Sequence, residues 1–318
     1  MDSRDVAREP RFETPDDAPF DRVAAIEAKL DALVERISAL QTHFYYDALN
    51  WNDFRSRFDR FVLECEDRQR DILEAVIRRS EVKPVNVRVV TAKALADDTP
   101  DHLFPRGTAV DNTRSPRFVA ACETQFGSRL RHLDIGSAGG GLVWDFTQRG
   151  HFSIGIEGSD WSRKEQRAEW RTIPDRLFTA DVRFPFRVED EAGESQQFDL
   201  VTAWELFEHI PEADLPTLLH SICRHLRPGG VVVASIATFA DRDEAGHDFH
   251  ATIRDRAWWE DLFMASGLIP IESPFQLRDY PRGSGNPRAH DWDARANPEL
   301  GFHLVARHRP EQTQRISE

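Results

Sequence analysis

Short apolar runs alternate with helix-like patterns from Leu130 to the end of the chain. Strand–helix alternation with short links predicts a mostly parallel sheet that carries helices on both faces. We therefore expect an α/β fold in this part of the chain. The predicted strands are LRHLDIG, FSIGIEG, FDLVTAW, VVVASI and LGFHLVARH, and the predicted helices cover residues 141–150, 160–172, 212–227 and 255–266.

The N-terminal part follows a different pattern. Residues 1–19 are polar and contain three prolines, which predicts a disordered leader. In residues 20–43, apolar positions recur at spacings of three and four, as in a heptad stripe. This stripe favours either a coiled-coil helix that pairs with another chain or an amphipathic helix that packs on its own domain. It consists of Val23, Ile26, Leu30, Leu33, Ile37 and Leu40.

Residues 44–127 connect these two parts. Apolar positions in residues 44–80 favour helices, whereas residues 81–127 are mixed. The stretch 105–118 is rich in turn-forming residues and is expected to form a loop. We therefore predict a helical extension over residues 44–127, ahead of a domain at residues 128–318.

Charge and cysteine content narrow the class of protein. Lys and Arg number 41 and Asp and Glu number 55, so the net charge of −14 argues against a nucleic-acid partner. No apolar run approaches the roughly 18 residues of a membrane span, and the N-terminus lacks a secretory apolar core. Cys65, Cys122 and Cys223 lie far apart and fit no zinc spacing. Sparse, reduced thiols indicate a cytoplasmic protein.

A glycine-rich loop, LDIGSAGGG at residues 133–141, follows the first predicted strand. Glycines allow a ligand to approach the main chain, and the helix that follows presents free N–H groups. No Lys-Ser/Thr pair follows, so the loop is not a P-loop. Asp134 precedes the glycines and would repel a pyrophosphate, so the loop favours a cationic or hydroxyl-bearing ligand.

Two further acidic residues follow predicted strands. Glu157 ends the next strand, 23 residues after Asp134, where doubly wound folds hold ribose hydroxyls. Asp181 ends a third candidate strand in LFTADVRFPF. The stretches FDLVTAWELFEHIPE and LRPGGVVVASI complete a series of five motifs.

Taken in order, these motifs resemble the class I S-adenosylmethionine-dependent methyltransferases over residues 117–308. The resemblance implies a Rossmann-like doubly wound fold, a methyltransferase domain at 128–318, and an extension at 44–127 that caps the acceptor side. Ser137 and Ala138 replace the Cys and middle Gly of the usual motif, and Ala138 fits if its φ is negative. The implied cofactor residues are Asp134, Gly136, Ser137, Ala138 and Gly140 for the methionine part, Glu157 for the ribose, Asp181 for the adenine amino group, and Trp204 beside the donor.

A candidate metal site lies in WELFEHIPE. Glu205, Glu208 and His209 share one face if this backbone is helical or turn-like, and carboxylates with imidazole suit Mg²⁺ or Mn²⁺. The E-x-x-E-H pattern resembles ubiquinone-biosynthesis O-methyltransferases and small-RNA 3′-end 2′-O-methyltransferases. In the latter group a histidine after the fifth strand completes the site, which implies His250 here. Two alternatives remain open: His250 as a metal-free general base, and purely structural roles.

The acceptor side is less defined. A polar cluster in 105–118, consisting of Arg106, Asp111, Asn112, Arg114 and Arg117, is a candidate for acceptor binding or a solvated loop. Trp258 and Trp259 are candidates for stacking, although helical spacing favours at least one of them in the core. The Gly/Pro-containing insertion 279–293 is a candidate lid. Its candidate residues are Tyr280, Arg282 and His290.

We therefore expect an O-methyltransferase that acts on a small hydroxylated acceptor, with a sugar or glycan precursor favoured. Its catalytic residues would be His250, His209 and Glu205, and its cofactors S-adenosylmethionine and a divalent cation. Two alternatives are an RNA 3′-terminal 2′-O-methyltransferase and a non-catalytic S-adenosylmethionine-binding scaffold. Residues 20–43 are the candidate segment for a homo-oligomer.

Overall fold

The computed structural model describes residues 29–38, 84–284 and 292–309. The chain divides into two compact units, Met1–Glu81 and Val82–Glu318. The leader predicted at 1–19 and the helices predicted at 44–80 lie outside the described residues. The sheet and the candidate site belong to the second unit.

Residues 29–38 form a helix, within the segment predicted at 20–43. Three apolar side chains of this helix, those of Leu30, Val34 and Ile37, are exposed by 52%, 58% and 37%. The helix is therefore amphipathic in sequence but does not bury these side chains. Pairing of this segment with a second copy stays a prediction.

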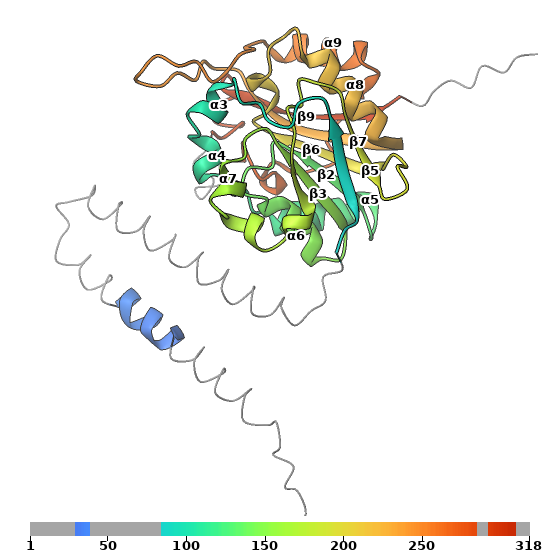
Figure 1. The fold of residues 1–318 in the computed structure, drawn as a ribbon. Helices are drawn as coiled ribbons and strands as arrows, with labels where there is room; N and C mark the ends of the chain where they lie inside the picture. Colours follow the sequence, from blue (N-terminus) through green and yellow to red (C-terminus); the bar gives the residue numbers. More distant parts are fainter. Residues whose placement is uncertain (1–28, 39–83, 285–291, 310–318) are drawn as a thin grey trace, which may run out of the picture. The chain divides into compact units, whose positions relative to one another are not determined.

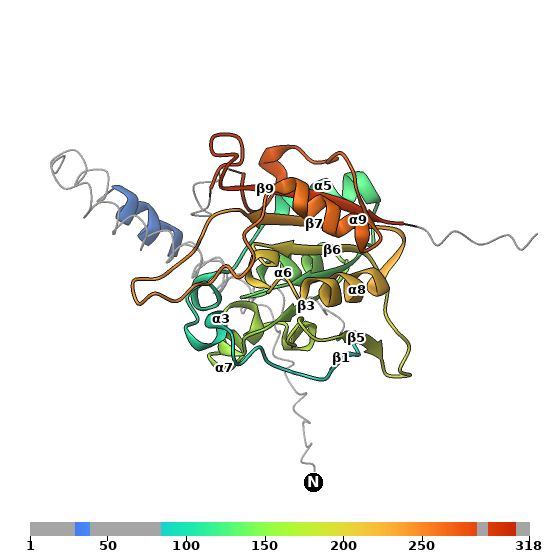
Figure 2. The ribbon, with the colours of Figure 1, turned by 90° about the horizontal axis from the view of Figure 1, so that it is seen from above.

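A seven-stranded sheet forms the centre of the second unit (Figures 1 and 2), with strand order β4-β3-β2-β6-β7-β9-β8. Neighbouring strands from β4 to β7 run parallel, and β9 is antiparallel to β7 and β8. The predicted mostly parallel α/β fold is confirmed. The strands are β2 (Arg131–Ile135), β3 (Phe152–Glu157), β4 (Leu177–Thr179), β6 (Phe198–Trp204), β7 (Leu226–Ala237), β8 (Leu268–Pro270) and β9 (Gly301–His308).

Helices cover both faces of this sheet (Figure 2). Strand β6 shows the division, because its side chains alternate between the faces with a period of two. Val201 and Ala203 pack in the apolar layer under α8 and α9. Leu200 and Trp204 pack in the layer under α5 and α6. These helices are α5 (Pro116–Phe126), α6 (Gly141–Gln148), α8 (Leu215–His225) and α9 (Arg256–Ala265).

Local sequence signals fix where the helices begin. Ser115 caps α5 by accepting a hydrogen bond from the N–H of Phe118, and Pro116 occupies the first turn. Asp255 caps α9 in the same way, with the N–H of Trp258 at 2.9 Å. Both helices therefore start at residue types that satisfy the unpaired N–H groups of a first turn.

Part of the predicted helical extension is not helical. Strand β1 (Val87–Thr91) pairs antiparallel with β5 (Phe186–Asp190) as a separate two-stranded ribbon. The segment VRVVT favours a strand because it is dominated by β-branched residues. The loop predicted at 105–118 contains helix α4 (Gly107–Val110) and the start of α5, and α3 (Pro100–Leu103) precedes it.

The helix predicted at 160–172 is broken. Helix α7 (Trp161–Lys164) is followed by a separate 3₁₀ turn, η1 (Ala168–Arg171). Gln166 and Ala168 have φ values of 50° and 48°, which a continuous right-handed helix cannot accommodate. The other three predicted helices and the last strand are confirmed to within a few residues. The remaining short turns are η2 (Pro174–Arg176), η3 (Phe207–His209) and η4 (Leu277–Asp279).

In the part of the chain that the structure describes, no helix is both long and apolar enough to cross a membrane. Cys122 and Cys223 are free thiols, as predicted, and Cys65 lies outside the described residues. Burial raises the pKa of the Cys122 thiol well above its usual value. This thiol is therefore an apolar core group rather than a nucleophile.

Candidate active site

The glycine loop follows β2 at the carboxyl edge of the sheet, where doubly wound folds bind ligands. Gly136, Ala138 and Gly140 have φ values of 76°, 45° and 87°. Ala138 therefore does not meet the condition of a negative φ under which an alanine fits the motif. The loop turns back on itself, with the N–H of Gly140 2.7 Å from the carbonyl oxygen of Ser137. This turn carries Ala138 into the left-handed region.

The segment 112–114 packs directly against this loop. A Cβ atom added at Gly139 or Gly141 would lie 2.6 Å from a side-chain atom of Asn112 or Arg114. Neither position therefore has space for a side chain. Asn112 is itself fixed by a 2.9 Å hydrogen bond to Glu169.

Glu157 lies at the end of β3, and its carboxylate is hydrogen-bonded to the glycine loop. Its Oε2 accepts a hydrogen bond from the N–H of Ala138 at 2.8 Å, and its Oε1 accepts one from Ser159 at 3.1 Å. Burial raises the pKa of Glu157, and these backbone donors oppose that rise. The carboxylate predicted to hold the cofactor ribose is therefore also tied to the glycine loop.

Asp134 is buried at the end of β2, 3% exposed. The hydroxyl of Thr202 on β6 donates to its Oδ1 at 2.6 Å. Burial, aided by the charge of Glu157, raises the pKa of Asp134 to about 7. A cationic ligand would stabilise the ionised form of such a carboxylate.

The other two predicted cofactor residues have protein contacts. Arg183 binds both carboxylate oxygens of Asp181, through Nε at 2.9 Å and a terminal nitrogen at 2.6 Å. Trp204 packs edge-on against Phe118, with ring centroids 5.1 Å apart. Its Nε1 is buried and has no partner among the described residues. The structure thus gathers the glycine loop with Asp134 and Glu157, while the cofactor roles of all these residues stay predictions.

The E-x-x-E-H stretch follows β6 at the same edge of the sheet. Glu208 and His209 lie in η3, whereas Glu205 precedes that turn and has a φ of 51°. The turn therefore includes Glu208 and His209 but not Glu205, and a common face for all three stays a prediction. One ligand atom each from Glu208, His209 and His250 lie within 4.8 Å of one another, a group we call the Glu-His-His cluster.

Glu208 is fully buried, and one of its carboxylate oxygens is unsatisfied. Oε1 accepts a hydrogen bond from the N–H of Ala237 at 3.0 Å. Oε2 is buried without a hydrogen-bond partner among the described residues. Burial raises the pKa of Glu208, and the charge of Glu205 adds to that rise. A buried carboxylate of this kind needs a proton or a cation beside it.

His209 is oriented by a residue that sequence reasoning missed. Its Nδ1 lies 2.9 Å from Oδ2 of Asp101, in α3. Burial lowers the pKa of His209, but Asp101, Glu208 and Glu205 outweigh it and raise the pKa to about 9. The hydrogen bond to Asp101 engages Nδ1, so Nε2 is the ring nitrogen that remains for other contacts. Nothing in the local sequence marks Asp101, because it approaches His209 only through the fold.

His250 presents the opposite electrostatic case. Its Nδ1–H donates to the carbonyl oxygen of Phe239 at 2.6 Å, which leaves the lone pair on Nε2. Burial and the charge of His209 lower its pKa. The two imidazole rings lie 4.8 Å apart. His250 is thus neutral with an unprotonated Nε2 beside a cationic neighbour.

Glu205 is held by the predicted lid insertion. Nε1 of Trp292 donates to its Oε2 at 3.1 Å, and Oε1 is buried without a partner among the described residues. Trp292 is buried and fills the space beside Gly283 and Gly301, where an added Cβ would lie 2.6 Å from its ring. Sequence reasoning missed Trp292, although it lies inside the candidate insertion.

Most of the predicted polar acceptor cluster contacts other protein groups. Arg106 pairs with Asp241, and its guanidinium lies 4.3 Å from the centre of the Phe249 ring. Asp111 pairs with Arg282. These contacts connect the segment around α4 to the loops after β7 and η4. Arg114 pairs with Asp145 at 2.6 Å, and Arg117 is exposed.

Two of the remaining aromatic candidates, Trp259 and Tyr280, are buried, and Trp258 is half-buried. Trp259 is fully buried, as expected of at least one tryptophan in this helix. Tyr280 is buried and stacks on His303, with ring centroids 3.7 Å apart. His290 lies outside the described residues. His247, in the loop after β7, stacks on Phe104 with ring centroids 3.9 Å apart.

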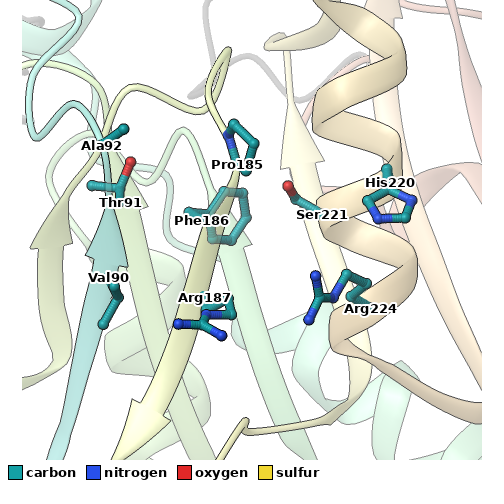
Figure 3. Close-up of a pocket in the computed structure, with 9 residues that line it drawn as sticks. All are labelled: Val90, Thr91, Ala92, Pro185, Phe186, Arg187, His220, Ser221 and Arg224. Carbon is teal, nitrogen blue, oxygen red and sulfur yellow. The ribbon is translucent and has the colours of Figure 1, made fainter.

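One cavity lies away from this site, between the β1–β5 ribbon and α8 (Figure 3). Its volume is about 280 Å³, and Arg187 and Arg224 extend beside it. It includes no residue of the glycine loop or of the Glu-His-His cluster. Its lining consists of Val90, Thr91, Ala92, Pro185, Phe186, Arg187, His220, Ser221 and Arg224.

Comparison with known protein families identifies the domain that carries this site. The family described as "Methyltransferase domain" matches residues 106–285, more than half of the chain. The chain belongs to this family. The family model thus shows a methyltransferase domain, which agrees with the family that the five motifs resemble.

Individual relatives of this methyltransferase are distant. A ubiquinone biosynthesis O-methyltransferase from Methylobacterium sp. (strain 4-46) is 26% identical over 172 residues. That alignment covers 54% of this chain and 55% of the relative, so the chain spans about half of the relative's length.

Two solved structures are similar. One is the 1,6-didemethyltoxoflavin N1-methyltransferase of Burkholderia thailandensis with S-adenosylhomocysteine, at 17% identity and a TM-score of 0.43, covering 66% of this chain and 84% of that one. The other is an amino pentose methyltransferase from Micromonospora echinaspora with S-adenosylmethionine, at 16% identity and a TM-score of 0.39, covering 60% and 88%.

Proposed function

We propose that this methyltransferase transfers the methyl group of S-adenosylmethionine to a hydroxyl group of a small hydroxylated acceptor. One observation carries the proposal. In the Glu-His-His cluster, each side chain is anchored through one atom, and one ligand atom from each lies within 4.8 Å of the others. The atoms outside these anchoring contacts are Oε2 of Glu208 and Nε2 of His250, which can accept a proton, and the protonated Nε2 of His209. Such an arrangement suits the removal of a proton from an acceptor hydroxyl.

On the donor side, we assign the methionine part of the cofactor to Asp134 and the loop residues Gly136, Ser137, Ala138 and Gly140. Buried Ser137 Oγ, which lacks a partner among the described residues, supports this assignment. Glu157 would accept hydrogen bonds from the ribose hydroxyls, and Asp181 would face the adenine. Trp204 would lie beside the donor methyl group.

The reaction follows from these placements. The acceptor hydroxyl gives its proton to Nε2 of His250 as its oxygen attacks the methyl carbon of the sulfonium. The carbon–sulfur bond breaks, and its electron pair stays on sulfur as S-adenosylhomocysteine forms. His209, held by Asp101, and Glu208 orient the hydroxyl. Alignment of the two reactants supplies much of the rate gain.

The same residues fit a divalent cation. The orphaned Oε2 of buried Glu208, with two imidazoles, is a donor set that Mn²⁺ or Mg²⁺ accepts, and Glu205 Oε1 is a second unsatisfied oxygen nearby in sequence. In this metal-assisted alternative, Glu208, His209 and His250 would be the ligands, with Glu205 as a further candidate, and His250 would not be the base. A bound cation would lower the pKa of the acceptor hydroxyl.

The acceptor class is the finer part of the proposal. The O-methyltransferase name of the curated relative supports a hydroxyl acceptor. We favour a sugar or glycan precursor. The 3′-terminal ribose of RNA is a second candidate, which the joining of His250 to Glu208 and His209 favours and the net charge of −14 opposes.

The flanking segments complete the proposal. We assign residues 128–318 to the methyltransferase domain and residues 44–127 to a cap on the acceptor side. The contacts of Asp101 with His209 and of Arg106 with Asp241 support this role for the described part of the cap. Residues 20–43 stay a candidate oligomerisation segment.

An acceptor panel tests the proposed reaction. Labelled S-adenosylmethionine is incubated with sugars, catechols, amines and short RNA duplexes with free or blocked 3′-terminal riboses. Label on small hydroxylated acceptors supports the proposal. Transfer to amines alone would contradict it, and transfer that requires a free 3′-terminal ribose would select RNA instead.

A calorimetric titration tests the cation. Mn²⁺ and Mg²⁺ are added to chelator-stripped protein saturated with S-adenosylhomocysteine, beside Glu208→Gln. Saturable binding that Glu208→Gln loses supports a metal-assisted reaction. Absence of binding by both proteins would leave His250 as the base without metal.

A further inference from the structure

Four polar side chains form a hydrogen-bonded chain inside the sheet. Ser153 Oγ lies 2.8 Å from Nδ1 of His132, and Nε2 of His132 lies 2.8 Å from the hydroxyl of Thr202. Thr202 then donates to Asp134 at 2.6 Å. The first three residues are completely buried, and Asp134 is 3% exposed. The chain therefore ends at the carboxylate that precedes the glycine loop.

Strand register explains how these residues meet. His132 and Asp134 are two positions apart on β2 and therefore point to the same face of the sheet. Ser153 of β3 lies opposite His132 of β2, and Thr202 of β6 lies opposite Asp134 of β2. His132 also stacks on Phe146 of α6, with ring centroids 3.9 Å apart. The hydrogen-bonded chain of side chains thus spans β3, β2 and β6 on the face of the sheet that α6 covers.

The positions of the protons along this chain follow from its ends. An ionised Asp134 only accepts hydrogen bonds, so the Thr202 hydroxyl donates its hydrogen bond to Asp134. The Thr202 oxygen must then accept from His132, which places the ring proton on Nε2. Nδ1 of His132 consequently accepts from the Ser153 hydroxyl. Burial holds the pKa of His132 well below its usual value, which keeps the ring neutral.

We propose that His132 and Thr202 are positioning residues for the cofactor, because their hydrogen bonds fix the orientation of Asp134 toward the amino-acid part of S-adenosylmethionine. This inference rests on the assignment of Asp134 to the methionine part in the proposed function. The alternative is that the chain only stabilises the sheet. The neighbouring buried positions of β2 and β6 on the opposite face are Leu133, Ile135, Val201 and Ala203.

Removal of the Thr202 hydroxyl gives the clearest test. Thr202→Val keeps the shape of the side chain but cannot donate to Asp134. We expect its affinity for S-adenosylhomocysteine to fall roughly tenfold, the scale of one lost hydrogen bond to a charged group. Thr202→Ser restores the hydroxyl and should restore the affinity.

A second ligand separates positioning from structural damage. 5′-Methylthioadenosine shares the nucleoside but lacks the amino-acid part, so Thr202→Val should bind it as the wild type does. Thr147→Val is the matched control, because Thr147 is a buried threonine whose hydroxyl donates to Val143 in α6, away from Asp134. It should leave both affinities unchanged.

The outcomes that contradict the inference are distinct. If Thr202→Val loses affinity equally for S-adenosylhomocysteine and 5′-methylthioadenosine, the hydrogen-bonded side chains only stabilise the sheet. Asp134→Asn provides the comparison. If Asp134→Asn loses S-adenosylhomocysteine while Thr202→Val does not, the positioning inference fails alone. If neither variant changes the affinity, the assignment of Asp134 fails as well.

Nitrogen-15 NMR of the histidines tests the chain without altering its residues. We expect a neutral His132 with its proton on Nε2, and no titration of this ring across the neutral range. A proton on Nδ1 would overturn the proposal, because Thr202 would then donate to the ring instead of to Asp134.

Discussion

Nδ1 of His209 lies 2.9 Å from Oδ2 of Asp101, although 108 positions separate the two residues in the sequence. Asp101 belongs to α3, before the glycine loop, and His209 to η3, after β6. A carboxylate on one imidazole nitrogen fixes the ring and aims the other nitrogen. The contact therefore connects α3 to the Glu-His-His cluster.

Replacement of Asp101 tests this connection. We expect Asp101→Asn to lower kcat by about 10–100-fold, the usual cost of losing such a partner, with little change in cofactor affinity. Asp97→Asn is the control, because Asp97 is an exposed carboxylate on the same segment that pairs with Lys93. Steady-state kinetics with an identified acceptor make the comparison. Equal rates for Asp101→Asn and wild type would remove Asp101 from the mechanism.

Glu157 provides a prediction on the donor side. Glu157→Ala should weaken S-adenosylhomocysteine binding by about 1.5–3 kcal/mol, since it removes hydrogen bonds to a charged group. The glycine loop would also lose its contact at Ala138. Calorimetric titration measures the change, and Glu165→Ala, at an exposed position, serves as the control. An unchanged affinity would contradict the ribose assignment.

Ala138 offers a stability test of the loop conformation. Its φ of 45° strains an alanine but not a glycine. Ala138→Gly should therefore stabilise the protein by about 1 kcal/mol, or about 2–4 °C in Tm. The same change at Ala120, inside helix α5, should destabilise by a similar amount. Thermal unfolding that shows a loss at both positions would contradict the left-handed conformation of Ala138.

The lowered pKa of His303 predicts how the free energy of unfolding depends on pH. Burial lowers its pKa to about 4, while its Nε2–H donates to the carbonyl oxygen of Arg282 at 2.6 Å. The unfolded ring titrates near pH 6.5. Its contribution to stability is therefore complete above pH 6.5 and is lost as the pH falls toward 4. The loss is of the order of 3 kcal/mol.

Urea unfolding at several pH values checks this prediction. His303→Gln removes the titrating group and keeps a side-chain donor, so its stability should fall less between pH 6.5 and 4. His220→Gln, at an exposed position, should follow the wild type. Identical pH profiles for His303→Gln and wild type would show that His303 does not titrate on unfolding.

The sheet and its order of motifs could be predicted from sequence because each strand is a short apolar run with its own turn signals. The glycine loop, Glu157 and the Glu208–His209 pair were found for the same reason, since they lie directly after strands. Asp101 and Trp292 were missed because they reach His209 and Glu205 through contacts between distant segments. The strand β1 was missed because its partner, β5, lies far along the chain.

The central claim is that an acceptor hydroxyl loses its proton at the Glu-His-His cluster. The most direct test compares His250→Ala with His247→Ala, a histidine of the same loop that pairs with Asp243. Methyl transfer from labelled S-adenosylmethionine to a hydroxylated acceptor and S-adenosylhomocysteine affinity are measured for both. We expect His250→Ala to lose transfer and keep the affinity, while His247→Ala keeps both. Transfer by His250→Ala at the wild-type rate would contradict the claim.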